Sequence, residues 1–280
     1  MTENSSTTIN NWLIAAVSTL RSASIQSARL DSLLLLCDEL GKDKAWILAH
    51  DEDELTPDKI ALLDKKVARR VTHEPLAYIR GTVEFYSRDF SVSRDVLVPR
   101  PESEAMISLL KNLEEPPATI IDVGTGSGSL AITAALETPQ ATVIATDIDP
   151  RCLAVAQKNA RILGAAVTCI ESDLLESINS DRLSEGSVLL ANLPYVPQNY
   201  PINQAATHEP HLALFSGSSG LDHYTKLFVQ ATALPTPPSY IITESLYNQH
   251  HALAELARKH MYVLVDSEGL AQCFALEVRS

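Results

Sequence analysis

The feature that most constrains the fold is a regular alternation of short apolar runs and helical patterns from residue 120 onward. The runs are short and rich in β-branched residues, whereas in the segments between them apolar residues recur every three or four positions. This alternation is typical of a mainly parallel sheet with helices on both faces, because parallel strands need a long crossover connection. Strands are predicted at residues 120–123, 142–146, 167–170, 188–191, 240–243, 262–265 and 272–278, and helices from Ser129, Pro150, Leu221 and Asn248.

The last two predicted strands lack a helical pattern between them. They can therefore pair directly, and we expect them to close the sheet as an antiparallel pair. The predicted fold class is α/β, with a mainly parallel sheet and an antiparallel closing pair.

The first part of the chain has the pattern of a small helical domain. Apolar residues recur every three or four positions between about residues 10 and 70, as in Trp12, Ala16 and Leu20. We assign residues 1–80 to this N-terminal helical domain.

The sequence pattern changes after Gly81. Aromatic and β-branched residues predict a β-hairpin linker over residues 81–98, including the run Val96-Leu97-Val98. Pro99 and the proline two residues later end strand structure, because proline cannot donate to a strand ladder. Residues 99–280 are assigned to the larger domain.

Composition argues against several classes of protein. The formal net charge of -13 opposes binding to a phosphate backbone, so we expect no direct nucleic-acid partner. The four cysteines form no Cys-x-x-Cys pair, and we expect neither a disulfide framework nor a metal site. The start lacks the pattern of a secretory signal, and its longest apolar run is far too short for a membrane span of about 20 residues. We therefore expect a cytoplasmic protein with no membrane segment. The sequence does not determine the oligomeric state, and a monomer is the expectation.

The first motif is a glycine loop directly after the strand at residues 120–123. Gly124, Gly126 and Gly128, with Thr125 and Ser127 between them, allow a tight turn and close approach of a ligand to the backbone. Backbone amides at the start of the next helix can meet a carboxylate or a phosphate. The loop lacks the Gly-Lys-Ser/Thr of ATPases and the third glycine of the dinucleotide fingerprint. It predicts a nucleotide-like ligand, with a plain tight turn as the alternative.

Acidic residues follow or end the neighbouring strands. Asp147 comes roughly 20 residues after the glycine loop, where an acid can accept both hydroxyl protons of a ribose. Asp173 and Leu174 could provide a polar contact and an apolar surface for an adenine ring, although Asp173 also suits a solvated loop. Asp122 could organise the loop amides or receive the ammonium group of the ligand. Asp149 is better explained as the cap of the helix at Pro150.

The second motif, Asn192-Leu193-Pro194-Tyr195, ends the predicted strand at residues 188–191. The Asn192 side-chain oxygen and the Leu193 carbonyl can accept the two protons of a planar NH2 group, and Tyr195 can pack on its flat face. An amide nitrogen is a poor nucleophile, so its orientation toward an electrophilic methyl group is the main requirement. Together with a methyl donor on the glycine loop, the motif predicts methyl transfer to an amino or amide nitrogen, although in isolation it would be a simple turn.

With these motifs, the sequence resembles the peptide-chain release factor N5-glutamine methyltransferases over nearly its whole length. The N-terminal stretches that carry the resemblance are residues 29–35, 45–50, 74–79 and 85–86. The most family-specific stretch is Val96-Leu97-Val98-Pro99-Arg100-Pro101-Glu102-Ser103-Glu104. The resemblance also includes the glycine loop, Asp147, Asn192 to Tyr195, and residues 209–214 and 219–224.

The resemblance implies a class I, Rossmann-like methyltransferase that uses S-adenosyl-L-methionine to methylate the glutamine of the Gly-Gly-Gln motif of release factors. It implies that residues 124–128, Asp147, Leu174 and Asn192 line the donor site, and that residues 192–195 hold the glutamine. The helical domain over residues 1–80 would then dock the release factor.

The sequence departs from the family pattern at two places. Leu193 replaces a proline whose fixed φ would help to preset the loop. We expect the chemistry to survive, because the Leu193 carbonyl is still available. Thr243-Glu244-Ser245 replaces the usual Glu-Ile/His-Gly.

Three other functions compete with this interpretation. A sister group methylates a glutamine of a ribosomal protein, but residues 99–102 resemble the release factor group more. Ribosomal RNA adenine methyltransferases have a similar tetrapeptide, with isoleucine or leucine at its second position. They carry their helical part after the catalytic domain, however, and need a basic surface. The third alternative is a non-catalytic module that binds release factors.

Overall fold

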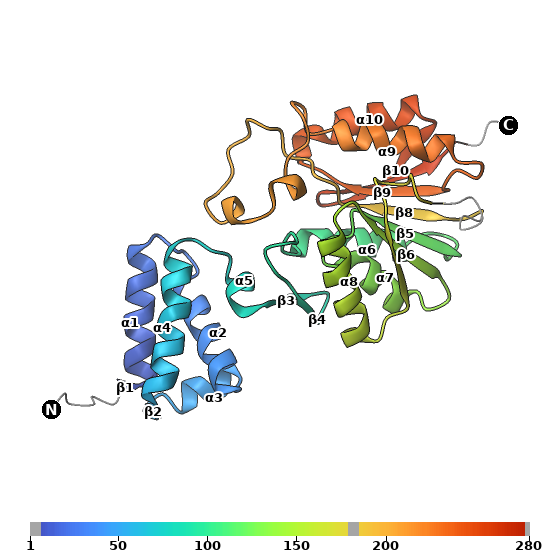
Figure 1. Ribbon diagram of the computed structural model, residues 1–280. Helices are drawn as coiled ribbons and strands as arrows, with labels where there is room; N and C mark the ends of the chain where they lie inside the picture. Colours follow the sequence, from blue (N-terminus) through green and yellow to red (C-terminus); the bar gives the residue numbers. More distant parts are fainter. Residues whose placement is uncertain (1–6, 179–184, 278–280) are drawn as a thin grey trace. The chain divides into compact units, whose positions relative to one another are not determined.

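The computed structural model describes residues 7–178 and 185–277 (Figure 1). These residues form two compact units. One comprises the described residues up to Gly81 together with Asn203–His208, and the other comprises Thr82–Ile202 and the described residues from Glu209 onward. No helix within residues 7–178 and 185–277 combines the length and the apolar character needed to cross a membrane.

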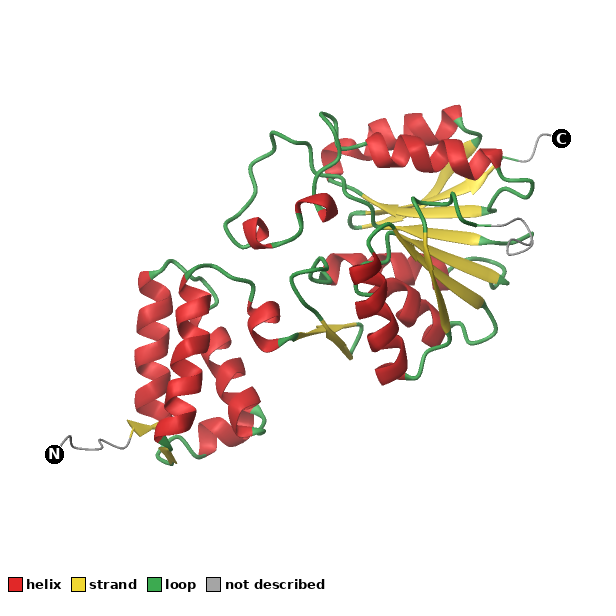
Figure 2. Ribbon diagram, viewed as in Figure 1, coloured by secondary structure: helices red, strands yellow, loops and turns green. Residues whose placement is uncertain are grey.

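The first unit is helical, as Figure 2 shows. Trp12, Ala16 and Leu20 lie on one face of its first helix and are buried in a core shared with the following helices. The pattern of apolar residues therefore predicted this unit correctly. Its elements are β1 (Thr7–Thr8), α1 (Ile9–Ser22), α2 (Ala28–Leu40), α3 (Lys44–Ala49), β2 (Glu54–Leu55), α4 (Pro57–Val71), α5 (Leu76–Arg80) and the 3-10 helix η3 (Ala206–His208).

A β-hairpin opens the second unit. Its strands β3 (Thr82–Phe85) and β4 (Arg88–Ser91) pair antiparallel. The predicted extension of strand structure to Val96-Leu97-Val98 is wrong, because these residues belong to no strand. Val96 and Val98 are nevertheless buried, so their apolar character reflects packing of an irregular segment.

A seven-stranded sheet forms the centre of the second unit, in the order β10-β11-β9-β8-β5-β6-β7. The five strands from β9 to β7 are parallel, and β11 is antiparallel to both β9 and β10. The predicted parallel sheet and its antiparallel closing pair are confirmed. The strands are β5 (Thr119–Val123), β6 (Thr142–Asp147), β7 (Val167–Glu171), β8 (Val188–Ala191), β9 (Tyr240–Glu244), β10 (Tyr262–Glu268) and β11 (Ala271–Leu276). Val278, the predicted end of the last strand, lies outside the described residues.

Helices cover both faces of this sheet (Figure 1). Alternate strand residues point to opposite faces, so Ile120 packs with one group of helices and Ile121 with the other. The first face carries α6 (Glu104–Lys111), α7 (Ser129–Glu137) and α8 (Pro150–Leu163), and the second carries α9 (Asp222–Ala233) and α10 (His250–Lys259). Helix α6 was not predicted from the sequence. The remaining 3-10 helices are η1 (Pro101–Ser103), η4 (His211–Ala213) and η5 (Tyr247–Gln249).

Candidate active site

A cavity of about 460 Å³ lies at the carboxyl ends of the parallel strands. The chain adds β6 and β7 on one side of β5 and then returns to its other side with β8. The strand order therefore reverses between β5 and β8, the place where open α/β sheets bind ligands. Residues that follow β5, β6, β7 and β8 all line this cavity. Its volume lies within the usual range for small-molecule sites, about 300–1,000 Å³.

The glycine loop joins β5 to α7. Gly124, Gly126 and Gly128 all have positive φ, at 72°, 54° and 82°, a region in which residues with a Cβ are strained. Gly124 and Gly126 line the cavity with Thr125 and Ser127, but Gly128 does not. A Cβ on Gly128 would lie 3.1 Å from the Ala156 backbone, so this glycine permits close packing of α7 against α8.

Asp122 holds the glycine loop from inside the sheet. Its Oδ2 accepts hydrogen bonds from the Thr125 hydroxyl at 2.6 Å and from the Ala131 amide at 3.0 Å. Burial raises the pKa of the Asp122 carboxyl to about 6, although these two hydrogen bonds oppose the rise. Asp122 also lines the cavity. The structure therefore shows that it organises the loop, one of the two roles expected from the sequence.

Asp147 ends β6 and lines the same cavity. One carboxylate oxygen accepts the Gly126 amide and the other the Asp149 amide, both at 2.9 Å. Burial raises the pKa of this carboxyl, and the two amides oppose the rise. Asp147 is thereby fixed against the glycine loop at the wall of the cavity.

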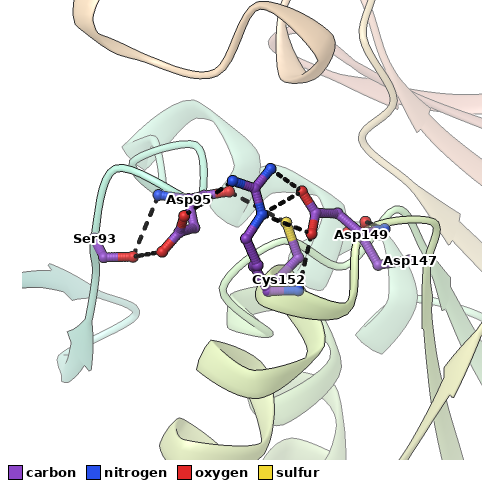
Figure 3. A network of polar contacts seen from close by, with 6 residues as sticks. Ser93, Asp95, Asp147, Asp149 and Cys152 are labelled. Carbon is purple, nitrogen blue, oxygen red and sulfur yellow. Dashed lines mark hydrogen bonds and ion pairs between the residues drawn. The ribbon is translucent and has the colours of Figure 1, made fainter.

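A polar network connects this wall to the segment after the hairpin (Figure 3). Asp149 caps α8, as predicted, by accepting the Arg151 amide at 2.8 Å, and it also binds the Arg151 guanidinium. Arg151 Nη1 lies 3.6 Å from Asp95, and the Cys152 thiol donates to the Asp95 carbonyl. Ser93 in turn donates to the Asp95 carboxylate at 2.9 Å. The segment after β4 is thus held close to the start of α8.

Asp173 and Leu174 follow β7 and also line the cavity. The Asp173 carboxylate is 40% exposed and forms an ion pair with Lys226 at 2.6 Å, which agrees with a partly solvated acid. Leu174 is 8% exposed and has a φ of 57°, unusual for a residue with a branched side chain. Together with Ile148, it provides an apolar part of the lining.

The tetrapeptide after β8 enters the cavity through its first three residues. Asn192, Leu193 and Pro194 line the cavity, but Tyr195 is not among the lining residues. The Tyr195 hydroxyl instead donates to Oε1 of Glu244, at the end of β9, at 2.8 Å. The side chain of Leu193 is buried beside the glycine loop, and a Cβ on Gly124 would lie 3.0 Å from it.

Distant residues fix the backbone of this tetrapeptide. The Tyr224 hydroxyl donates to the Glu244 carbonyl and lies 3.1 Å from the Ala191 carbonyl, which ties the ends of β8 and β9 together. The Gln249 amide donates to the Tyr195 carbonyl at 2.8 Å. A Cβ on Gly220 would lie 2.1 Å from that same carbonyl, so only glycine fits there.

Sequence reasoning missed two segments of the site. Residues 94–103 follow the hairpin, and residues 210–213 precede α9; both contribute to the lining. Arg100 and Glu209 join them through an ion pair of 2.6 Å, in which the Glu209 side chain is 1% exposed. Burial raises the pKa of Glu209, and Arg100 opposes this rise. Neither segment has a regular apolar period, but both contain stretches that resemble the family.

Known proteins resemble this chain in sequence and in fold. Residues 11–81 match the family model described as PrmC N-terminal domain, and residues 103–208 match the one described as Methyltransferase small domain. A Koribacter versatilis protein named release factor glutamine methyltransferase is 38% identical over 94% of this chain and 96% of its own length. One of the same name from Moorella thermoacetica is 35% identical over 95% and 97%.

A crystal structure of a methyltransferase from Pyrococcus furiosus has a similar fold. It has a TM-score of 0.53 and 16% identity, and the match covers 77% of this chain and all of that one. At this level of identity the match shows the methyltransferase fold alone.

Proposed function

Because this chain belongs to the family of release factor glutamine methyltransferases, we propose that it methylates the N5 side-chain amide nitrogen of the glutamine in the Gly-Gly-Gln motif of release factors. The enzyme uses S-adenosyl-L-methionine as its methyl donor. One observation carries the proposal. The glycine loop follows β5 and Asn192 follows β8, the two neighbouring strands between which the strand order reverses, and both line one cavity. The relatives described above are named for release factors, so they favour neither a ribosomal-protein glutamine nor an RNA adenine as the substrate.

The donor side of the cavity fits the expected ligand. Asp147 presents a fixed carboxylate near the glycine loop, suited to the hydroxyls of a ribose. Ile148 and Leu174 offer apolar contacts for a flat base, and we assign Asp122 and Gly124, which also line the cavity, to the amino-acid portion of the donor. A sulfonium donor supplies an electrophilic methyl group together with a good leaving group, so the protein needs mainly to orient the acceptor.

On the acceptor side, the NH2 end of the Asn192 side-chain amide is already hydrogen-bonded. Its Nδ2 donates to the Ser103 hydroxyl at 2.8 Å, whereas no hydrogen bond to its Oδ1 occurs within the described parts of the chain. We assign Oδ1 and the Leu193 carbonyl as the acceptors of the two N–H protons of the substrate amide. Orientation of this kind can lower a barrier by up to about 7–11 kcal/mol when both partners are fully aligned.

The first unit is proposed to dock the release factor. It is a separate compact unit, and several apolar side chains on its helices are exposed, among them Ile14, Leu30, Leu48 and Leu62. Exposed apolar side chains mark a protein-binding surface when they form a contiguous patch. We propose that these side chains contribute to such a patch and add binding energy outside the reacting glutamine.

The proposal is tested by transfer of a labelled methyl group from S-adenosyl-L-methionine to a purified release factor. We expect label on the wild-type release factor and none on a variant whose Gly-Gly-Gln glutamine is replaced by alanine. Equal label on both, or label on ribosomal RNA or a ribosomal protein instead, would contradict the proposal. Binding of the release factor without any transfer would identify a non-catalytic module.

A further inference from the structure

A buried carboxylate, that of Glu244, contacts the tetrapeptide but does not line the cavity. The Glu244 side chain ends β9 and is 1% exposed, and its Oε1 accepts the Tyr195 hydroxyl at 2.8 Å. Its other oxygen, Oε2, is buried and has no hydrogen-bond partner among the described residues. A buried carboxylate oxygen without a donor is costly, so a nearby group should supply a proton to it.

Ser103 is placed to do this. It is 4% exposed, at the end of η1, and its Oγ accepts the Asn192 Nδ2 proton at 2.8 Å. Burial raises the pKa of the Glu244 carboxyl, and the polar side chains of Ser103, Tyr195 and Asn192 oppose that rise. A serine hydroxyl can accept one hydrogen bond while it donates another, and its proton rotates toward the best acceptor.

The direction of these hydrogen bonds follows from the carboxylate. When the Glu244 carboxyl is ionised it can only accept, and rotation of the Ser103 hydroxyl proton toward its unpaired Oε2 satisfies that oxygen. The Ser103 oxygen is then free only to accept, and of the two ends of the Asn192 amide only Nδ2 can donate to it. The Oδ1 end is therefore turned toward the cavity.

We propose that Ser103 and Glu244 are positioning residues that fix the amide orientation of Asn192, so that its Oδ1 faces the acceptor nitrogen. The reversed amide would set the Asn192 N–H groups against the N–H groups of the substrate. The proposal rests on the proposed function for its consequence in catalysis, but the orientation itself is a property of the free enzyme.

The first test uses the free enzyme labelled with ¹⁵N. The side-chain amide resonances of Asn192 are identified by their loss in Asn192→Ala, and their proton exchange with solvent is then measured. We expect exchange at least about tenfold faster in Ser103→Ala, because loss of one hydrogen bond of ordinary strength changes an equilibrium by about this factor. Ser108→Ala removes a hydroxyl from the same short region, at a residue of α6, and serves as the control with unchanged exchange. Equal exchange rates in Ser103→Ala and wild type would overturn the proposal.

The second test distinguishes an effect on orientation of the acceptor amide from an effect on binding of the methyl donor. At saturating donor, kcat with the release factor should fall about tenfold in Ser103→Ala and in Glu244→Gln, whose amide can donate to Ser103 and so reverse the direction of the hydrogen bonds. Ser103→Thr, which keeps the hydroxyl, should retain most of the activity. The Kd for S-adenosyl-L-methionine, measured by calorimetry, should stay within about twofold in all three variants.

The outcomes distinguish the two proposals. Wild-type kcat in Ser103→Ala, or a donor Kd that rises in proportion to the loss of kcat, would overturn the positioning role. A wild-type enzyme that transfers no methyl to the release factor would instead contradict the proposed function, and the exchange rates of the free enzyme would still decide the orientation of Asn192.

Discussion

The glycine loop and the tetrapeptide meet at the same edge of the sheet, but they are held in different ways. The glycine loop is held largely by residues nearer in the sequence: Asp122 bonds to Thr125 and Ala131, both fewer than ten residues away, and Asp147 accepts the amide of Gly126, 21 residues before it. The tetrapeptide depends on residues far away in the sequence. Its side chains and carbonyls are held by Ser103, Glu244 and Gln249, which lie 89, 49 and 54 residues from their partners.

This difference is the reason to expect that leucine is acceptable where the family usually has proline. A proline limits φ from within the chain, whereas here Gln249, Tyr224 and Glu244 hold the backbone and side chains of the loop from outside. Leu193 also fills the space beside Gly124 with its buried side chain. The acceptor loop can therefore be rigid without the proline.

The largest expected effect is on the acceptor side. Asn192→Ala should lower kcat by at least about 100-fold, because the substrate amide loses the group that orients it. The Kd of the donor should change little, since Asp147 and the glycine loop do not depend on Asn192. Asn112→Ala, at the exposed end of α6, is the matched control. Comparable activity of Asn192→Ala and wild type would remove the acceptor loop from the mechanism.

The next effect tests the donor side. Gly128→Ala should lower the free energy of unfolding by about 3 kcal/mol, because it combines a positive φ with a contact of 3.1 Å to the Ala156 backbone. Gly164→Ala has a similar φ of 69° with open space around the new Cβ, and should cost about 1 kcal/mol. Chemical denaturation measures both. Equal losses would show that local packing does not set the shape of the glycine loop.

Asp122 predicts a pH dependence of stability. Its pKa is raised to about 6 in the folded protein, from 3.8, so the folded state holds this proton more tightly than the unfolded state. The resulting stabilisation is fully present below about pH 3.8 and is lost as the pH rises through about 6. Relative to wild type, Asp122→Asn should therefore gain up to about 3 kcal/mol in unfolding free energy between pH 4 and pH 7.5. A difference that does not change with pH would contradict the raised pKa.

The smallest expected effect on kcat concerns Leu193. Leu193→Pro should change kcat by less than about threefold, because loss or gain of backbone freedom matters little in a loop held from outside. Leu193→Ala should lower the free energy of unfolding by about 2–4 kcal/mol, since it empties a buried site beside Gly124. A tenfold rise of kcat in Leu193→Pro would show that the outer contacts do not fix the loop.

The same contrast decides what could be predicted from the sequence. Periods of apolar residues and the glycine loop are local signals, so the sheet, its closing pair and the residues around Gly124 and Asp147 could be predicted. The irregular run at Val96 could not be predicted, because buried β-branched residues look alike in strands and in packed loops. Helix α6 was not predicted either. The partners of Asn192 could not be predicted either: Ser103 and Glu244 become its neighbours only through the order of strands and the docking of η1.

The most direct test of the account is a crystal structure of the enzyme with S-adenosylhomocysteine and a release factor whose Gly-Gly-Gln glutamine is intact. We predict that the glutamine amide nitrogen lies within hydrogen-bond distance, about 2.7–3.2 Å, of Asn192 Oδ1, with Nδ2 still on Ser103 and the donor sulfur on the opposite side of the nitrogen. A glutamine bound away from Asn192, or an Asn192 amide turned so that Nδ2 faces it, would contradict the account.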